Sequence, residues 1–119
     1  MKMIRSLANA ISGLSFVFRT QFNFRVHLII SIIVFIFSWY FRVTLIEWCV
    51  LLLCIGSVLT AELVNTSIEQ NTDLVTREQN ELAKNTKDIA AAAVLTVSVV
   101  SAIIGIIIFL PHFIQEFNS

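Results

Sequence analysis

The sequence contains few charged residues and few residues that interrupt helices. Asp, Glu, Lys and Arg make up only 13% of the 119 residues, and eight basic residues balance eight acidic ones. Soluble domains carry about 25% charged residues, and nucleic-acid-binding domains usually carry a basic excess, so both classes are excluded. Three glycines and one proline favour long helices over a membrane β-barrel, whose strands alternate apolar and polar residues.

Hydrophobic residues, by contrast, make up 57% of the chain. A small domain buries a smaller fraction of its surface than a large one, so a water-soluble fold of this length could not hide so many apolar side chains. We therefore predict an all-α integral membrane protein, formed by one domain over residues 1–119. Cys49 and Cys54 lie within one apolar run, and we interpret them as packing residues rather than as a disulfide.

The apolar positions predict one surface helix and three membrane-spanning helices. In residues 1–24, apolar residues recur at helical spacing between polar ones. This pattern is typical of an amphipathic helix on the membrane surface, and we expect no cleavable signal peptide there. Three later segments, at about 25–41, 44–69 and 88–114, contain apolar runs suited to crossing a bilayer.

The basic residues indicate how the chain is oriented. Three spans place the two termini on opposite sides of the membrane. Seven of the eight basic residues would share the side of the N-terminus; these are Lys2, Arg5, Arg19, Arg25, Arg77, Lys84 and Lys87. The positive-inside rule makes that side cytoplasmic, so we expect the N-terminus inside the cell and the C-terminus outside.

Four polar residues recur along one helical face where the second span leaves the membrane. Glu62, Asn65, Glu69 and Asp73 fall within roughly 80° of one another on an α-helix. Carboxylates at a membrane boundary are costly and usually mark function, and a carboxylate row suits Mg²⁺ bound together with phosphate oxygens. For Asp73, a solvated helix face is an equally good explanation.

Other polar residues close to the spans are less specific. Lys84, Lys87 and Asp88 stand at the start of the third span, where a lysine can neutralise a phosphate or simply extend to the lipid headgroups. His27 and His112 flank apolar runs, and we interpret both as interfacial residues rather than ligands.

The segment Glu62–Asp73 resembles the signature E-x-x-N-[ST]-[AS]-[IV]-E-x-x-x-D of the bacterial integral-membrane diacylglycerol kinase family, which includes the undecaprenol kinases. Glu81–Lys84 and Lys87–Leu95 also resemble the family pattern. Phe18–Thr20 and Asn23–His27 are similar to the F-R-T-E-x-N-F-R-x-H segment of the undecaprenol kinase branch.

The resemblance implies a multi-pass protein of the bacterial inner membrane. Family members are homotrimers with active sites shared between subunits, and they act in lipid metabolism and phospholipid biosynthesis. They transfer the γ-phosphate of ATP, with Mg²⁺, to the hydroxyl of a lipid alcohol. The partners implied are therefore ATP, a second and third copy of the chain, membrane lipids, and undecaprenol or diacylglycerol as acceptor, with no nucleic acid.

The resemblance also implies a role for individual residues of this sequence, at the positions that match the family motif. Glu62 matches the catalytic base, and Glu62 and Asn65 match residues that contact the lipid substrate. Glu69 matches a metal-binding carboxylate. The residues implied for ATP binding are Glu69, Glu78, Asn80, Lys87 and Asp88.

One departure from the family pattern matters for metal binding. Gln21 stands where the family has a metal-binding glutamate; its amide oxygen can ligate Mg²⁺ but contributes no charge. Gln21 is therefore kept as a candidate metal ligand. Two alternatives stay open: a non-catalytic trimeric relative that binds nucleotide or lipid, and a small ion-transporting subunit that uses Glu62 as an ion site.

Overall fold

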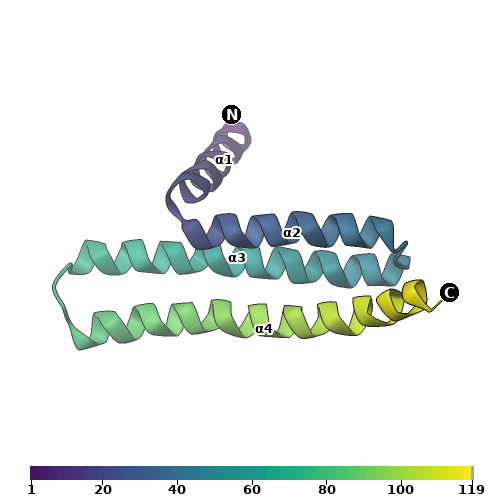
Figure 1. Ribbon diagram of the computed structural model, residues 1–119. Helices are drawn as coiled ribbons and strands as arrows, with labels where there is room; N and C mark the ends of the chain where they lie inside the picture. Colours follow the sequence, from purple (N-terminus) through teal and green to yellow (C-terminus); the bar gives the residue numbers. More distant parts are fainter. Residues whose placement is uncertain (119) are drawn as a thin grey trace.

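The computed structural model describes residues 1–118, which form four α-helices and no strand (Figure 1). The helices are α1 (Lys2–Thr20), α2 (Phe22–Tyr40), α3 (Leu45–Val75) and α4 (Glu81–Phe117). The predicted all-α class is confirmed. Ser119, the last residue of the predicted domain, lies outside the described residues.

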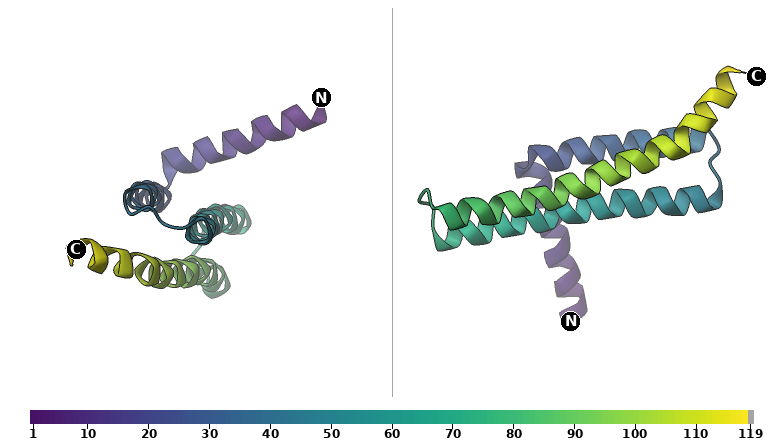
Figure 2. Two further views of the ribbon diagram at one scale, coloured as in Figure 1. Left: turned by 90° about the vertical axis from the view of Figure 1, so that its right-hand side faces the viewer. Right: turned by 90° about the horizontal axis from the view of Figure 1, so that it is seen from below.

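Three of these helices, α2, α3 and α4, are long and apolar enough to span a membrane. With 31 and 37 residues, α3 and α4 exceed the roughly 20 residues that a bilayer crossing needs. α1 turns away from the other three helices (Figure 2) and exposes apolar side chains, including Met3, Leu7 and Ile11. This arrangement agrees with a surface helix beside three spans.

α3 is the central element of the bundle, because it contacts α1, α2 and α4. Val43, Leu51 and Ile108 form a small buried cluster close to the turn between α2 and α3. Aromatic rings extend this cluster, among them Phe41 and Phe109, whose centroids lie 6.3 Å apart. Most other large apolar side chains are exposed, as expected for helices that face lipid.

The turn between α2 and α3 is short and well defined. Arg42 adopts a left-handed backbone conformation, with φ 52°. Thr44 then caps α3: its Oγ1 accepts from the Glu47 backbone N–H, and a Glu47 side-chain oxygen accepts from the Thr44 backbone N–H. Such a capping box satisfies two donors at a helix start, which fixes where α3 begins.

The helices at the other end are longer than the sequence pattern predicted. The segment expected at 44–69 continues as helix to Val75, and the one expected at 88–114 begins at Glu81 and ends at Phe117. Asn80 explains the early start, because its Oδ1 accepts from the backbone N–H groups of Leu82 and Ala83 and so caps α4.

The junction of α1 and α2 positions the surface helix. Gln21 follows α1 in an extended conformation and also precedes α2. Arg25 donates to the backbone carbonyls of Phe18 and Arg19, at 3.0 Å each. These carbonyls lack partners in the last turn of a helix, so Arg25 ties α2 to the end of α1.

Candidate active site

The predicted polar face lies on the half of α3 that approaches the loop between α3 and α4. We call this half of the bundle the loop end, and the half near residues 41–44 the turn end. Glu62, Asn65, Glu69 and Asp73 all belong to α3. The structure therefore keeps the four residues on one helix, as their spacing predicts.

Glu62 is the most buried charged residue, with 3% of its surface exposed. Its Oε1 lies 3.3 Å from Nε2 of His27, which α2 supplies. A buried charge is costly unless it is paired, so this contact explains how Glu62 is accommodated. It also brings together two positions 35 residues apart in sequence.

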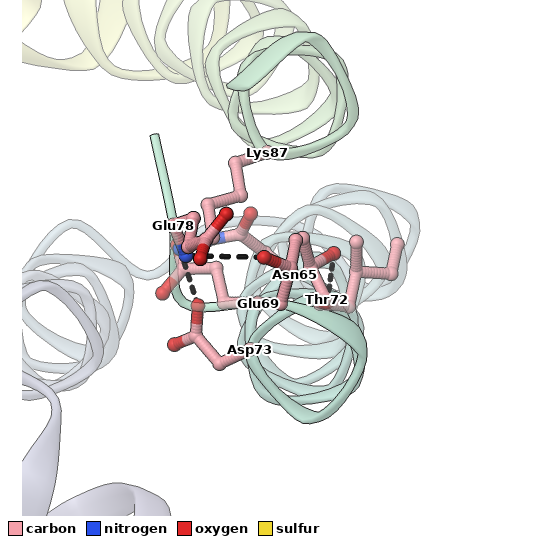
Figure 3. Close-up of polar contacts among 8 residues, drawn as sticks. Asn65, Glu69, Thr72, Asp73, Glu78 and Lys87 are labelled. Atoms are coloured by element: carbon pink, nitrogen blue, oxygen red, sulfur yellow. Dashed lines mark hydrogen bonds and ion pairs between the residues drawn. The ribbon is translucent and has the colours of Figure 1, made fainter. Parts of the chain in front are cut away.

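One turn further along α3, Asn65 Nδ2 donates to Glu69 Oε1 at 3.1 Å (Figure 3). The other polar atom of the amide, Oδ1, is buried and has no hydrogen-bond partner among the described residues. Buried polar atoms are nearly always paired, so this oxygen is suited to a ligand. Carboxylate and amide oxygens are also the donors that Mg²⁺ accepts.

Lys87 reaches from α4 to the same face of α3. Its Nζ lies 2.6 Å from Asp73 Oδ1. Figure 3 marks this ion pair with a dashed line. The neighbouring Asp88 instead pairs with Lys84 at 2.6 Å, and both of those side chains are mostly exposed. Adjacent residues on a helix point about 100° apart, so Lys87 pairs with a residue of α3 whereas Asp88 pairs with a residue of its own helix.

The nucleotide-binding positions implied by the resemblance gather at a polar hollow of about 200 Å³ at the tip of the loop end. Its walls include Glu78, Asn80, Lys87 and Asp88. Glu69 does not line it. Asn80 uses its oxygen to cap α4, which leaves the amide nitrogen as the group that could meet a ligand.

An apolar hollow of about 550 Å³ lies between α3 and α4 and reaches Asn65. Small side chains open it, since Gly56, Ala61 and Ala90 form part of its wall. A hydrocarbon chain is the kind of group that such a surface accommodates. Asn65 thus lines the apolar hollow and also donates a hydrogen bond to Glu69.

Gln21 lies at the junction of α1 and α2, where its side-chain Nε2 donates to Thr20 Oγ1 at 3.4 Å. Residues 1–118 contain no group of three or more His, Cys, Asp or Glu residues placed to hold a metal. Mg²⁺ commonly binds one or two carboxylates plus substrate phosphates, so Glu69 and Asn65 Oδ1 fit such a site.

Sequence reasoning missed the contact of His27 with Glu62. The available signal was that α2 and α3 form an antiparallel pair, in which a polar residue early in α2 lies level with one late in the apolar run of α3. His112, like His27, was interpreted as an interfacial residue. In the structure its Nε2 lies 3.1 Å from Glu47 Oε1 at the turn end.

A surface helix, three helices long and apolar enough to span a membrane and a polar site at one end define a small multi-span membrane protein. The sequence model of the family described as prokaryotic diacylglycerol kinase matches residues 8–109. The chain belongs to this family, as the motifs predicted, and it is a lipid kinase.

Three curated proteins illustrate the relationship. The chain is 39% identical over 110 residues to the undecaprenol kinase of Bacillus subtilis, covering 92% of this chain and 89% of that one. It is 36% identical over 110 residues to the diacylglycerol kinase of Synechocystis, covering 92% and 63%. It is 33% identical over 95 residues to the diacylglycerol kinase of Helicobacter pylori, covering 79% and 73%.

Proposed function

We propose that this lipid kinase transfers the γ-phosphate of ATP, with Mg²⁺, to the hydroxyl of a membrane lipid alcohol, and that undecaprenol is its preferred acceptor. One observation carries the proposal. A single face of α3 presents the buried Glu62, then Asn65 with its unpartnered oxygen, then Glu69. The choice of undecaprenol over diacylglycerol rests on the likeness to the Bacillus subtilis enzyme and on the segment Asn23–His27.

Glu62 is the catalytic base in this proposal. The lipid oxygen forms a bond to the γ-phosphorus as the bond between that phosphorus and the bridging oxygen of the β-phosphate breaks. The hydroxyl proton passes to Glu62, and ADP leaves with the electron pair of the broken bond. Phosphoryl transfer depends mainly on positioning and charge neutralisation, so a single well-placed base is sufficient protein chemistry.

Asn65 and Glu69 stand between the lipid and the nucleotide. Asn65 contacts the lipid headgroup, a role supported by its place at the apolar hollow. Glu69 and Asn65 Oδ1 would hold Mg²⁺, with Gln21 as a further candidate ligand. When bound, Mg²⁺ neutralises negative charge on the transferred phosphate.

The nucleotide occupies the loop end in this proposal. Lys87 neutralises phosphate charge, and its place beside the α3 face supports that role. Glu78 and Asn80 contact the nucleotide from the polar hollow. Asp88 also binds it, although it pairs with the exposed Lys84 within one chain.

The pairing of Asp88 with Lys84, rather than with the α3 face, is one reason to propose a homotrimer with shared active sites. Asp88 and Gln21 both lie on elements other than the α3 face, so a neighbouring copy could bring equivalent residues to it. We further propose that the loop end faces the cytoplasm, with the N-terminus inside and the C-terminus outside. The basic residues that flank this end support that orientation.

Transfer of labelled γ-phosphate from Mg-ATP to lipid tests the proposal directly. Purified protein in bilayers is offered undecaprenol and diacylglycerol separately. We expect labelled lipid, more from undecaprenol, and a loss of about 10²–10⁴-fold in Glu62→Gln. Glu47→Gln is the matched control, because it makes the same substitution on the same helix at the turn end.

Two outcomes would contradict the proposal. A folded protein that labels neither lipid would contradict the assignment of these acceptors and leave Gln21 as the first position to test. Equal loss in Glu62→Gln and Glu47→Gln would remove the assignment of Glu62 as the base.

A further inference from the structure

We propose that His27 is a positioning residue for Glu62: it holds one oxygen of the carboxylate and leaves the other free to accept the proton of the lipid hydroxyl. This inference rests on the proposed function, because it assigns a partner to the proposed base. The contact that carries it is the 3.3 Å separation of His27 Nε2 and Glu62 Oε1.

Glu62 has His27 as the sole charged or titratable side chain within ion-pair distance, among the residues that the structure describes. Only 5% of the Glu62 side chain is exposed, so water contributes little to its solvation. The Thr66 hydroxyl donates to the Glu62 backbone carbonyl and leaves the carboxylate untouched. His27 is therefore the group that can stabilise the ionised form of Glu62.

The orientation of a base matters as much as its charge. A carboxylate that rotates freely presents its lone pairs in many directions, whereas one held at Oε1 presents Oε2 in a fixed one. In metal sites, groups that orient a ligand in this way typically contribute about 10–100-fold to affinity or activity, and we expect a similar effect for an oriented base. A neutral imidazole with its proton on Nε2 donates to Oε1 and fulfils this role.

His112 and Glu47 form a second His–Glu contact at the turn end, and there the carboxylate has a structural role. Glu47 Oε1 lies 3.1 Å from His112 Nε2, but it also accepts from the Thr44 backbone N–H at 2.9 Å. That carboxylate is occupied in capping α3. Among the described residues, the Glu62 carboxylate accepts from no backbone N–H of this kind and meets His27 alone.

Three substitutions test the role. His27→Met removes the strong donor while filling similar space, and His27→Gln restores an amide donor at about the reach of Nε2. We expect His27→Met to lower kcat by about 10–100-fold with the KM for ATP unchanged, and His27→Gln to recover most of that loss. His112→Met, the matched control, leaves kcat unchanged.

The outcomes separate this inference from the proposed function. If wild-type protein phosphorylates lipid and His27→Met has wild-type kcat, only the role of His27 is overturned. If wild-type protein transfers no phosphate to lipid, the proposed function is overturned, and the role of His27 is overturned with it. A loss of kcat that His27→Gln does not recover, or one that accompanies a lowered unfolding temperature in both variants, would indicate a structural role and overturn the inference.

A second comparison keeps the test decisive if His27→Met does not fold. His27→Asn retains a polar amide, but its nitrogen is too close to the backbone to reach Glu62. We expect the kcat of His27→Asn to fall well below that of His27→Gln. Equal values in two folded variants would contradict positioning by this contact.

Discussion

The two ends of the helical bundle contain the same pair of residue types in different surroundings. At the turn end, Glu47 and His112 have about a quarter of each side chain exposed. At the loop end, His27 is similarly exposed, whereas Glu62 is almost fully buried. The contact distances are alike, at 3.1 and 3.3 Å, so distance alone does not distinguish the two pairs.

The difference lies in what else each carboxylate does. Glu47 completes a capping box with Thr44, and its pairing with His112 joins the start of α3 to the end of α4. Tyr40 and Glu116 join α2 to α4 at the same end, at 3.4 Å. Residues of the turn end therefore bond to one another, whereas at the loop end one buried polar atom, Asn65 Oδ1, has no hydrogen-bond partner among the described residues.

The sharpest way to test this contrast is to remove one carboxylate charge at each end. Glu69→Gln should raise the Mg²⁺ concentration needed for half-maximal lipid phosphorylation by about 10–100-fold, because it removes charge from the candidate metal site. Glu47→Gln, on the same helix, should leave that concentration unchanged. Titration of activity with Mg²⁺ at saturating ATP measures both.

Equal shifts in the two variants would mean that the loop end has no special relation to the metal. A large fall in activity at all Mg²⁺ concentrations in Glu69→Gln would instead assign Glu69 to the nucleotide alone.

Gln21 offers a substitution that should improve the site. Gln21→Glu restores the charge that the family pattern has at this position, and we expect it to lower the half-saturating Mg²⁺ concentration by about fivefold, equivalent to roughly 1 kcal/mol. Gln21 follows α1 in an extended conformation, so the change does not interrupt a helix. Asn23→Asp, two residues away, is the control for a nearby added charge.

An unchanged Mg²⁺ requirement in Gln21→Glu would indicate that this position no longer contributes to metal binding. An equal improvement in Asn23→Asp would indicate a general effect of negative charge near α1.

Much of the fold follows from local sequence patterns. The apolar runs predicted three spans, and the spacing of Glu62, Asn65 and Glu69 predicted one face, because both depend on helical periodicity. The structure extends α3 to Val75 and begins α4 at Glu81, beyond the approximate bounds expected from the apolar runs. The cap formed by Asn80 accounts for the early start of α4.

Contacts between helices were less accessible to sequence reasoning. The pairings of His27 with Glu62 and of Lys87 with Asp73 join different helices, and their register depends on tertiary packing. Arg25 illustrates the same limit, because its bonds to the carbonyls that end α1 depend on how α1 and α2 meet.

The smallest expected effect concerns the two helix caps, which resemble each other in chemistry but lie at opposite ends. Asn80→Ala and Thr44→Ala should each lower the free energy of unfolding by about 1 kcal/mol, because each removes a side-chain acceptor from a helix start. Only Asn80 lines the polar hollow proposed for the nucleotide. Asn80→Ala should therefore also raise the KM for ATP severalfold, whereas Thr44→Ala should not.

Unfolding in detergent by denaturant measures the first quantity for both variants, and initial rates at varied ATP measure the second. Asn80→Asp is the informative companion, since its carboxylate retains the cap but lacks the amide nitrogen. If it restores stability without restoring the KM for ATP, the nitrogen of Asn80 meets the nucleotide. If it restores both, the loop end requires only a correctly started α4, and the contrast between the two caps disappears.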